Sequence, residues 1–166
     1  VEPRAKRRGT TKGSFYWHFA DRAALIDAAL AIWEREHTDA VIELAARASE
    51  GGSAGEQLRA LLQQVISRQF SDRIELGLLS STSDPRVRSA LQRVTARRVD
   101  HVATLYEGMG MSSRAAHERS VIAISVYLGH LQLRHIDSAT LPTNQRAWAS
   151  HLDLIMDVLT GEEPAP

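Results

Sequence analysis

The chain has 166 residues, of which 43% are apolar and 24% are charged, and its 20 basic and 20 acidic side chains give a formal net charge of zero. This length and composition suit a globular protein with one main core and are far from those of disordered or membrane-spanning proteins. The absence of cysteine excludes disulfides, thiolate metal sites and cysteine nucleophiles.

The charge is distributed unevenly along the chain. Residues 1–22 carry six basic and two acidic side chains, a balance of +4, so the other 144 residues sum to −4. A basic segment on a slightly acidic body suits a protein that touches a polyanion through that segment alone. No apolar run approaches the roughly 20 residues of a membrane span, and the first residues are charged where a signal peptide is apolar. We therefore expect a cytoplasmic protein without membrane contact.

The first predicted element is a helix-turn-helix within residues 1–20. A short helix ends at Arg8, the chain turns at Gly9, and Thr11 caps a second helix. Phe15 and Phe19 are four residues apart and would face inward together. Aromatic and basic side chains around a helix N-terminus suit a phosphate backbone and base edges. The exposed sides of this second helix carry such residues, namely Lys12, Ser14, Tyr16, Trp17 and His18.

A long linker helix is expected next, within residues 21–50. Asp21 is its N-cap, and apolar residues recur at three- and four-residue spacing as far as Leu44. A bend near His37 is an open alternative to a straight helix. The glycine-rich sequence SEGGSAG then ends the helix.

The rest of the chain, residues 51–166, also shows only helical patterns. A helix follows Ser53, and a shorter one starts at Asp72. Asp84 and Pro85 open a long helix that ends at Gly108. Two more helices are expected, one opened by Ser112 or Ser113 and one by Thr143. Since no alternating strand pattern of useful length appears, the sequence predicts an all-α fold.

The last two long helices carry more apolar surface than one neighbour can cover. From Val121 to Ile136 apolar residues occupy much of the circumference, and the final helix has a broad apolar stripe. These helices are either central in the monomer or close a dimer. We favour a homodimer in which each subunit gives two antiparallel helices to a four-helix bundle. The candidate interface residues are Leu128, Gly129, Gln132, Trp148, Leu152 and Ile155.

The sequence TKGSFYWHFADRAAL, residues 11–25, resembles the recognition helix, following turn and start of the linker helix in the tetracycline-repressor (TetR) family of bacterial transcription regulators. The layout of a linker helix followed by a helical body that ends in two long helices is similar over nearly the whole chain. The resemblance implies a partial helix-turn-helix followed by a TetR-like ligand-binding and dimerisation domain. It also implies a repressor that binds operator DNA as a homodimer and responds to a small-molecule effector.

The resemblance also implies roles for individual residues. Thr11 would cap the recognition helix and bond a phosphate, Lys12 and Ser14 would reach base edges or phosphates, and Gly13 would let the backbone approach the duplex. Tyr16, His18 and Arg22 would contact phosphates, and Trp17 would pack on a thymine methyl group. Against this stands a purely structural interpretation, in which Tyr16, Trp17 and His18 pack on the linker helix.

The chain departs from the family pattern at its start. The family's first helix has no counterpart, because only three residues precede the segment that begins at Arg4, and Arg4, Arg8 and Thr10 stand where core or small residues are usual. Either the sequence is a truncated repressor, which we favour, or it is a variant that has lost operator binding. In both cases we expect weak DNA binding by this chain.

The body is expected to bind the effector between the helices of residues 53–108 and the next long helix. The candidate ligand-binding residues are Phe70, Leu76, Leu79, His101, Val102, Tyr127 and His130. For His101 and His130 the alternative is a partly buried histidine bonded to a backbone carbonyl. The pair Arg97-Arg98 is interpreted as a solvated face rather than an anion site.

Enzyme motifs are missing from the sequence. It has no HExxH, no glycine-rich phosphate loop, no GxSxG and no paired carboxylates in an apolar run. We therefore expect no catalysis, no metal and no cofactor. The competing function is a ligand-binding or interaction dimer of the same fold that does not bind DNA.

Overall fold

A computed structural model describes residues 21–67 and 72–161 of the chain. Within these residues every element is a helix, which confirms the all-α prediction. In chain order the elements are α3 (Arg22–Glu34), π-helix η1 (Arg35–Asp39), α4 (Ala40–Ala48), α5 (Ala54–Ser67), α6 (Asp72–Leu79), α7 (Pro85–Gly108), α8 (Ser113–Ile136), 3-10 helix η2 (Ser138–Thr140) and α9 (Gln145–Thr160). The predicted recognition-helix residues 11–18 and the candidate Phe70 lie outside the described residues.

Side-chain caps fix the starts of the helices. Asp21 accepts from the Ala24 amide at 2.8 Å, and Asp84 accepts from the Arg86 amide at 2.9 Å. At the start of α5, the Ser53 amide donates to Glu56 at 2.7 Å while the Glu56 amide lies 3.3 Å from the Ser53 hydroxyl, a capping box.

The cap of the last helix differs from the prediction. Asn144, and not Thr143, accepts from the Ala147 amide, at 2.9 Å. Both residue types cap helices well, and they are adjacent, so propensity alone does not separate them.

The linker helix is continuous but contains one wide turn. In η1 the Ala40 amide donates to the Arg35 carbonyl five residues earlier, instead of the usual four. The wide turn therefore lies around His37, the residue near which the sequence leaves open a bend in the linker helix. The extra residue rotates the face that α4 presents relative to the face of α3.

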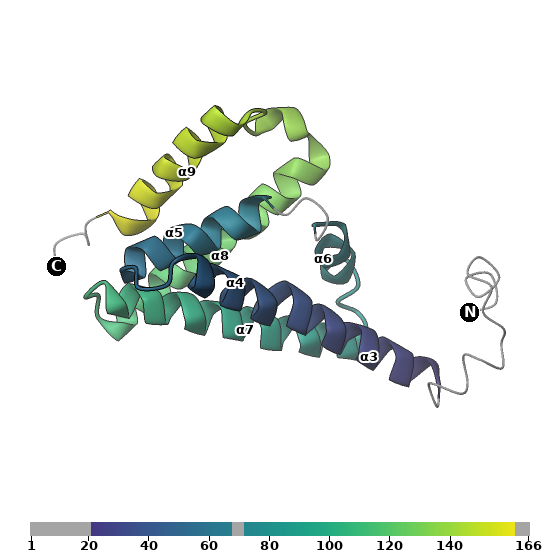
Figure 1. The fold of residues 1–166 in the computed structure, drawn as a ribbon. Coiled ribbons are helices and arrows are strands. Elements are labelled where there is room, and N and C mark those ends of the chain that lie inside the picture. Colours follow the sequence, from purple (N-terminus) through teal and green to yellow (C-terminus); the bar gives the residue numbers. More distant parts are fainter. Residues whose placement is uncertain (1–20, 68–71, 162–166) are drawn as a thin grey trace.

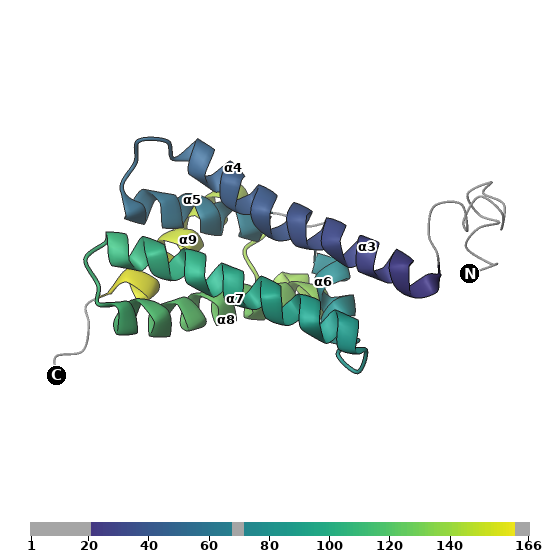
Figure 2. The same cartoon turned by 90° about the horizontal axis from the view of Figure 1, so that it is seen from below.

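The helices pack around two core clusters, a larger one and a smaller one. Figures 1 and 2 show the rod of α3, η1 and α4 lying along α7, with α5 running back beside α4. Helices α7 and α8 form the most extensively packed pair, and α9 folds back across α5 and α8 (Figure 1). The larger core cluster joins α4, α5, α7, α8 and α9, and it includes Leu58 and Tyr106, both fully buried.

A smaller core cluster fastens α3 to the first half of α7. It contains Leu30 and Trp33 of α3 together with Val87, Leu91 and Val94 of α7. The linker helix therefore packs against the body at two places, in the small cluster through α3 and in the large cluster through α4.

The predicted dimer residues divide into two groups. Leu152 and Ile155 are buried in the subunit's own core and Trp148 packs against it, whereas Gln132 is exposed and Leu128 and Gly129 are half-buried. Large apolar side chains nevertheless remain exposed on α8 and α9, namely Val121, Ile122, Leu133, Ile136, Leu154 and Val158. None of the described helices is long and apolar enough to cross a bilayer.

Candidate ligand-binding cavity

A cavity lies between the linker helix and the body. Four helices and the π-turn contribute its walls, so it lies between the rod, α5, α7 and α8. The lining residues are His37, Thr38, Val41, Ile42, Leu58, Leu61, Leu62, Val65, Arg98, His101, Val102, Ala123, Ile124 and Tyr127.

The cavity is small and mainly apolar. The volume open to the centres of water molecules is about 50 Å³, and the space between the atoms is about 540 Å³ when the opening to solvent is included. One water molecule needs roughly 10–15 Å³ of the volume that is open to water centres. The interior therefore has room for a few waters or one small ligand. Aliphatic side chains, mainly those of α4, α5 and α8, form most of the wall.

A largely buried ion pair adjoins the polar end of the cavity, where Arg98 forms part of the lining. Arg98 of α7 binds both carboxylate oxygens of Glu75 on α6, one from each terminal nitrogen, in a bidentate pair. The Tyr127 hydroxyl of α8 donates to Glu75 Oε2 at 2.9 Å. The Glu75 side chain is 2% exposed and that of Arg98 is 11% exposed, so solvent screens the pair little.

The π-turn completes the shell of Arg98. Its Nε lies 3.3 Å from the Thr38 hydroxyl, and Nη2 donates to the His37 carbonyl at 3.2 Å. The guanidinium also lies over the rings of Trp33 and Tyr127, with 5.9 Å and 5.4 Å to the ring centres. One side chain therefore joins the linker helix, α6, α7 and α8.

The imidazole of His101 is a polar group of the cavity that makes no hydrogen bond to the described part of the chain. Burial lowers the pKa of its imidazole below the ordinary 6.5, and the neighbouring charge of Arg97 lowers it further. The ring is therefore neutral at pH 7 and offers one donor and one acceptor nitrogen.

A polar groove adjoins the cavity on the surface between the rod and α7. Thr38, Ile42 and His101 line both spaces. Two ion pairs bridge the groove: Arg93 with Glu34, and Arg97 with Asp39 at 2.6 Å. Both arginine side chains are largely exposed, and exposed pairs contribute about 0–1 kcal/mol each, so they orient the rod more than they hold it.

A separate histidine pair joins α8 to α9. His130 Nδ1 lies 2.8 Å from the Val126 carbonyl, which can only accept, so this nitrogen carries the proton and donates. The other ring nitrogen of His130 lies 2.8 Å from Nε2 of His151 and accepts from it when both rings are neutral. Burial lowers the pKa of His151, and the charge of a protonated His130 lowers it further.

The structure brings three of the predicted ligand-binding residues together. His101, Val102 and Tyr127 line the cavity, whereas Leu76 and Leu79 of α6 and His130 of α8 do not. Leu79 is exposed, and His130 instead bonds a backbone carbonyl and His151. His130 therefore matches the alternative interpretation, that of a partly buried histidine bonded to a backbone carbonyl.

The sequence prediction omits the residues of the linker helix and the ion pair. Arg98, interpreted as part of a solvated face, is mostly buried, whereas its neighbour Arg97 is exposed. Glu75 carries no comparable signal in the sequence, because an isolated acidic residue on a short helix is usually solvated. The helical phase does carry a signal for Arg98, since one face of α7 holds, at three- and four-residue spacing, Leu91, Val94, Arg98, Val102 and Leu105.

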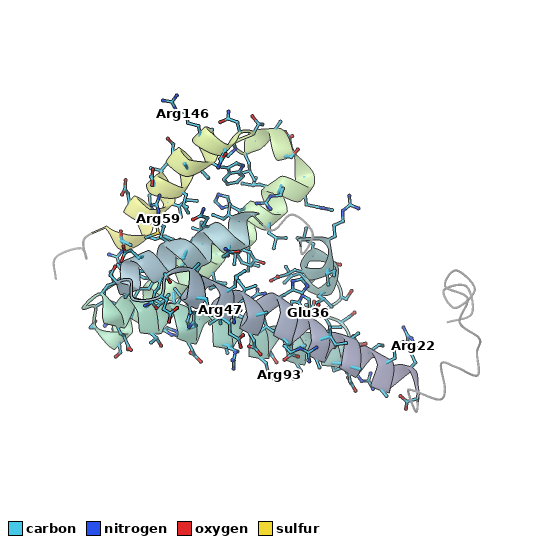
Figure 3. The ribbon with its side chains drawn as sticks, in the orientation of Figure 1. Arg22, Glu36, Arg47, Arg59, Arg93 and Arg146 are labelled. Carbon is cyan, nitrogen blue, oxygen red and sulfur yellow. The ribbon has the colours of Figure 1, made fainter. Side chains whose placement is uncertain are left out.

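Arg22, the predicted DNA contact within the described residues, is exposed at the start of α3 (Figure 3). No three His, Asp or Glu side chains of the described residues are grouped so as to hold a metal ion.

Comparisons with protein-family models, with curated proteins and with solved structures found no match to the chain.

Proposed function

We propose that the chain is a ligand-responsive transcription regulator, most simply a repressor, that acts on operator DNA as a homodimer. The observation that carries the proposal is that the linker helix forms one wall of the cavity through His37, Thr38, Val41 and Ile42. A ligand in the cavity would therefore touch the helix that leads directly to the basic, aromatic segment of residues 11–22.

The coupling follows from the way in which the rod is held. Displacing the π-turn disturbs the bonds of Arg98 to Thr38 and to the His37 carbonyl, while the small core cluster keeps α3 on α7. With the small core cluster as a pivot, a push at η1 would tilt the rod and move its N-terminal end. In a dimer, a shift of a few ångströms there alters the spacing of two DNA-reading helices, whose half-sites lie about 34 Å apart.

The homodimer is supported by the apolar side chains that α8 and α9 leave uncovered. Ile122 is 53% exposed, Leu154 is 56% exposed and Val158 is 65% exposed. Apolar groups on two antiparallel helices suit a four-helix bundle made with a second copy.

DNA binding is tested by fluorescence anisotropy with labelled DNA from the region upstream of the gene, at several salt concentrations. Arg22→Ala should weaken binding and reduce the salt slope by about one, because one phosphate contact is lost. Arg146→Ala is the matched control, since Arg146 is also exposed but lies on α9 (Figure 3). An equal effect of both substitutions, or no preference for upstream DNA over unrelated DNA, would favour a ligand-binding dimer that does not act on DNA.

A further inference from the structure

We propose that the cavity selects small, electrically neutral, mainly apolar molecules that carry one hydrogen-bonding group, and that it discriminates against carboxylates and amines of the same size. The inference names the ligand class of the cavity and rests on the proposed function only in assigning a ligand to that cavity.

The charge of Arg98, which lines the polar end of the cavity, is already balanced by Glu75, which lies outside the lining. Arg98 supplies one positive charge and Glu75 supplies one negative charge in direct contact with it. The guanidinium of Arg98 donates to Glu75, Thr38 and the His37 carbonyl, and both oxygens of Glu75 accept from Arg98. The pair therefore leaves no uncompensated charge for a ligand to neutralise.

A charged ligand would meet a penalty that a neutral one avoids. A carboxylate that enters must lose its hydration while Arg98 is held by Glu75, whose own charge repels it. An ammonium group that enters also loses its hydration, and the positive charge of Arg98 repels it. The aliphatic wall formed by Val41, Leu58 and Leu61 compensates neither charge.

A neutral hydroxyl or carbonyl group has a partner in the cavity. His101 lines the cavity, and its uncharged ring provides a donor and an acceptor that the described residues leave unused. An apolar wall with one neutral hydrogen-bonding group matches an aliphatic alcohol or ketone.

The direct test is isothermal titration calorimetry of the whole chain at pH 7.5, without DNA, with three probes of one chain length: 1-octanol, octanoate and octylammonium. We expect 1-octanol to bind at least about tenfold more tightly than either ion, because only the ions bury a charge without a counter-charge. Octanoate or octylammonium binding as tightly as 1-octanol, or none of the three binding, would overturn the proposal.

A variant tests the reason for the selectivity. Glu75→Gln keeps the shape of the side chain but removes the counter-charge of Arg98, so octanoate should gain about tenfold in affinity relative to 1-octanol. Glu107→Gln, at an exposed glutamate on α7, is the matched control and should leave the ratio unchanged. An unchanged ratio in a folded Glu75→Gln protein contradicts the proposal. If circular dichroism shows that this variant is unfolded, the three-probe series on the unmodified chain decides alone.

Failure of the ligand class and failure of the proposed function give different results. If the protein binds 1-octanol selectively but shows no sequence-selective DNA binding, the proposed transcription regulator is wrong and the proposed ligand class stands. If the protein binds DNA selectively but binds none of the three probes, the proposed ligand class is wrong and DNA binding stands.

Discussion

Two adjacent arginines on α7 have opposite surroundings. Arg97 is exposed and pairs with Asp39 at the edge of the groove, whereas Arg98 is mostly buried and pairs with Glu75. The difference arises from the helical period, because neighbouring residues on a helix point about 100° apart. One residue type at consecutive positions therefore contributes very differently to stability.

We predict that Arg98→Met destabilises the protein by about 3–5 kcal/mol, since it leaves the Glu75 carboxylate buried without its partner. Arg97→Met should cost at most about 1 kcal/mol, as expected for an exposed ion pair. Urea unfolding followed by circular dichroism measures both values. Equal losses for the two variants would show that the Glu75–Arg98 pair is not buried as described.

The same contrast shows where prediction from the sequence stops at the residue scale. The helical phase indicates that Arg98 shares a face with Val94 and Val102, but it does not indicate which side chain meets it there. Glu75 is 23 positions away in the chain, and its contact depends on how α6 docks against α7 and α8. The sequence does predict Tyr127 as a ligand-binding residue, and this side chain lines the cavity.

At the scale of elements, local signals predict most helix boundaries. Asp21 and Asp84 each cap the helix that the sequence assigns to them, and Ser112 is one of the two caps that it offers for α8, because the capping bond spans only two or three residues. The π-turn is less predictable, since apolar spacing indicates only that a bend near His37 is an alternative. The role of the linker helix as a cavity wall follows from tertiary packing, which no local pattern contains.

The α8–α9 hairpin gives a prediction of pH dependence. The pKa of His151 is lower in the folded chain than its ordinary 6.5, because burial and a protonated His130 disfavour its charged form. Below pH 6.5 the unfolded chain therefore binds more protons than the folded chain at this site, so stability decreases as the pH falls. From about one pH unit above 6.5 both states are essentially neutral there and this contribution is constant.

Urea unfolding between pH 7.5 and 5 measures this dependence. His151→Gln should flatten the decrease, because the group that titrates has been removed. His117→Gln is the control, since His117 is exposed on α8 and away from the pair. Arg134, which stacks on Trp148 near the pair, keeps its charge over the whole range and does not contribute to the slope. A slope that His117→Gln flattens as much as His151→Gln would contradict the assignment.

At the scale of the whole molecule, we predict a dimer that depends on α8 and α9. Ile122→Glu combined with Leu154→Glu places charges among their exposed apolar side chains and should produce a folded monomer. Ile74→Glu is the matched control, because Ile74 on α6 is 52% exposed and lies outside the two helices. Light scattering after size-exclusion chromatography measures the mass. A monomeric unmodified chain would contradict the prediction.

We propose that the cavity is coupled through the linker helix to the segment that would bind DNA. The most direct test is the anisotropy of labelled upstream DNA at low salt, titrated with the chain alone and with saturating 1-octanol. At low salt we predict weak but sequence-selective binding, whose affinity changes by at least about fivefold when the cavity is filled. Selective binding that the ligand leaves unchanged, although calorimetry shows the cavity occupied, would contradict the coupling.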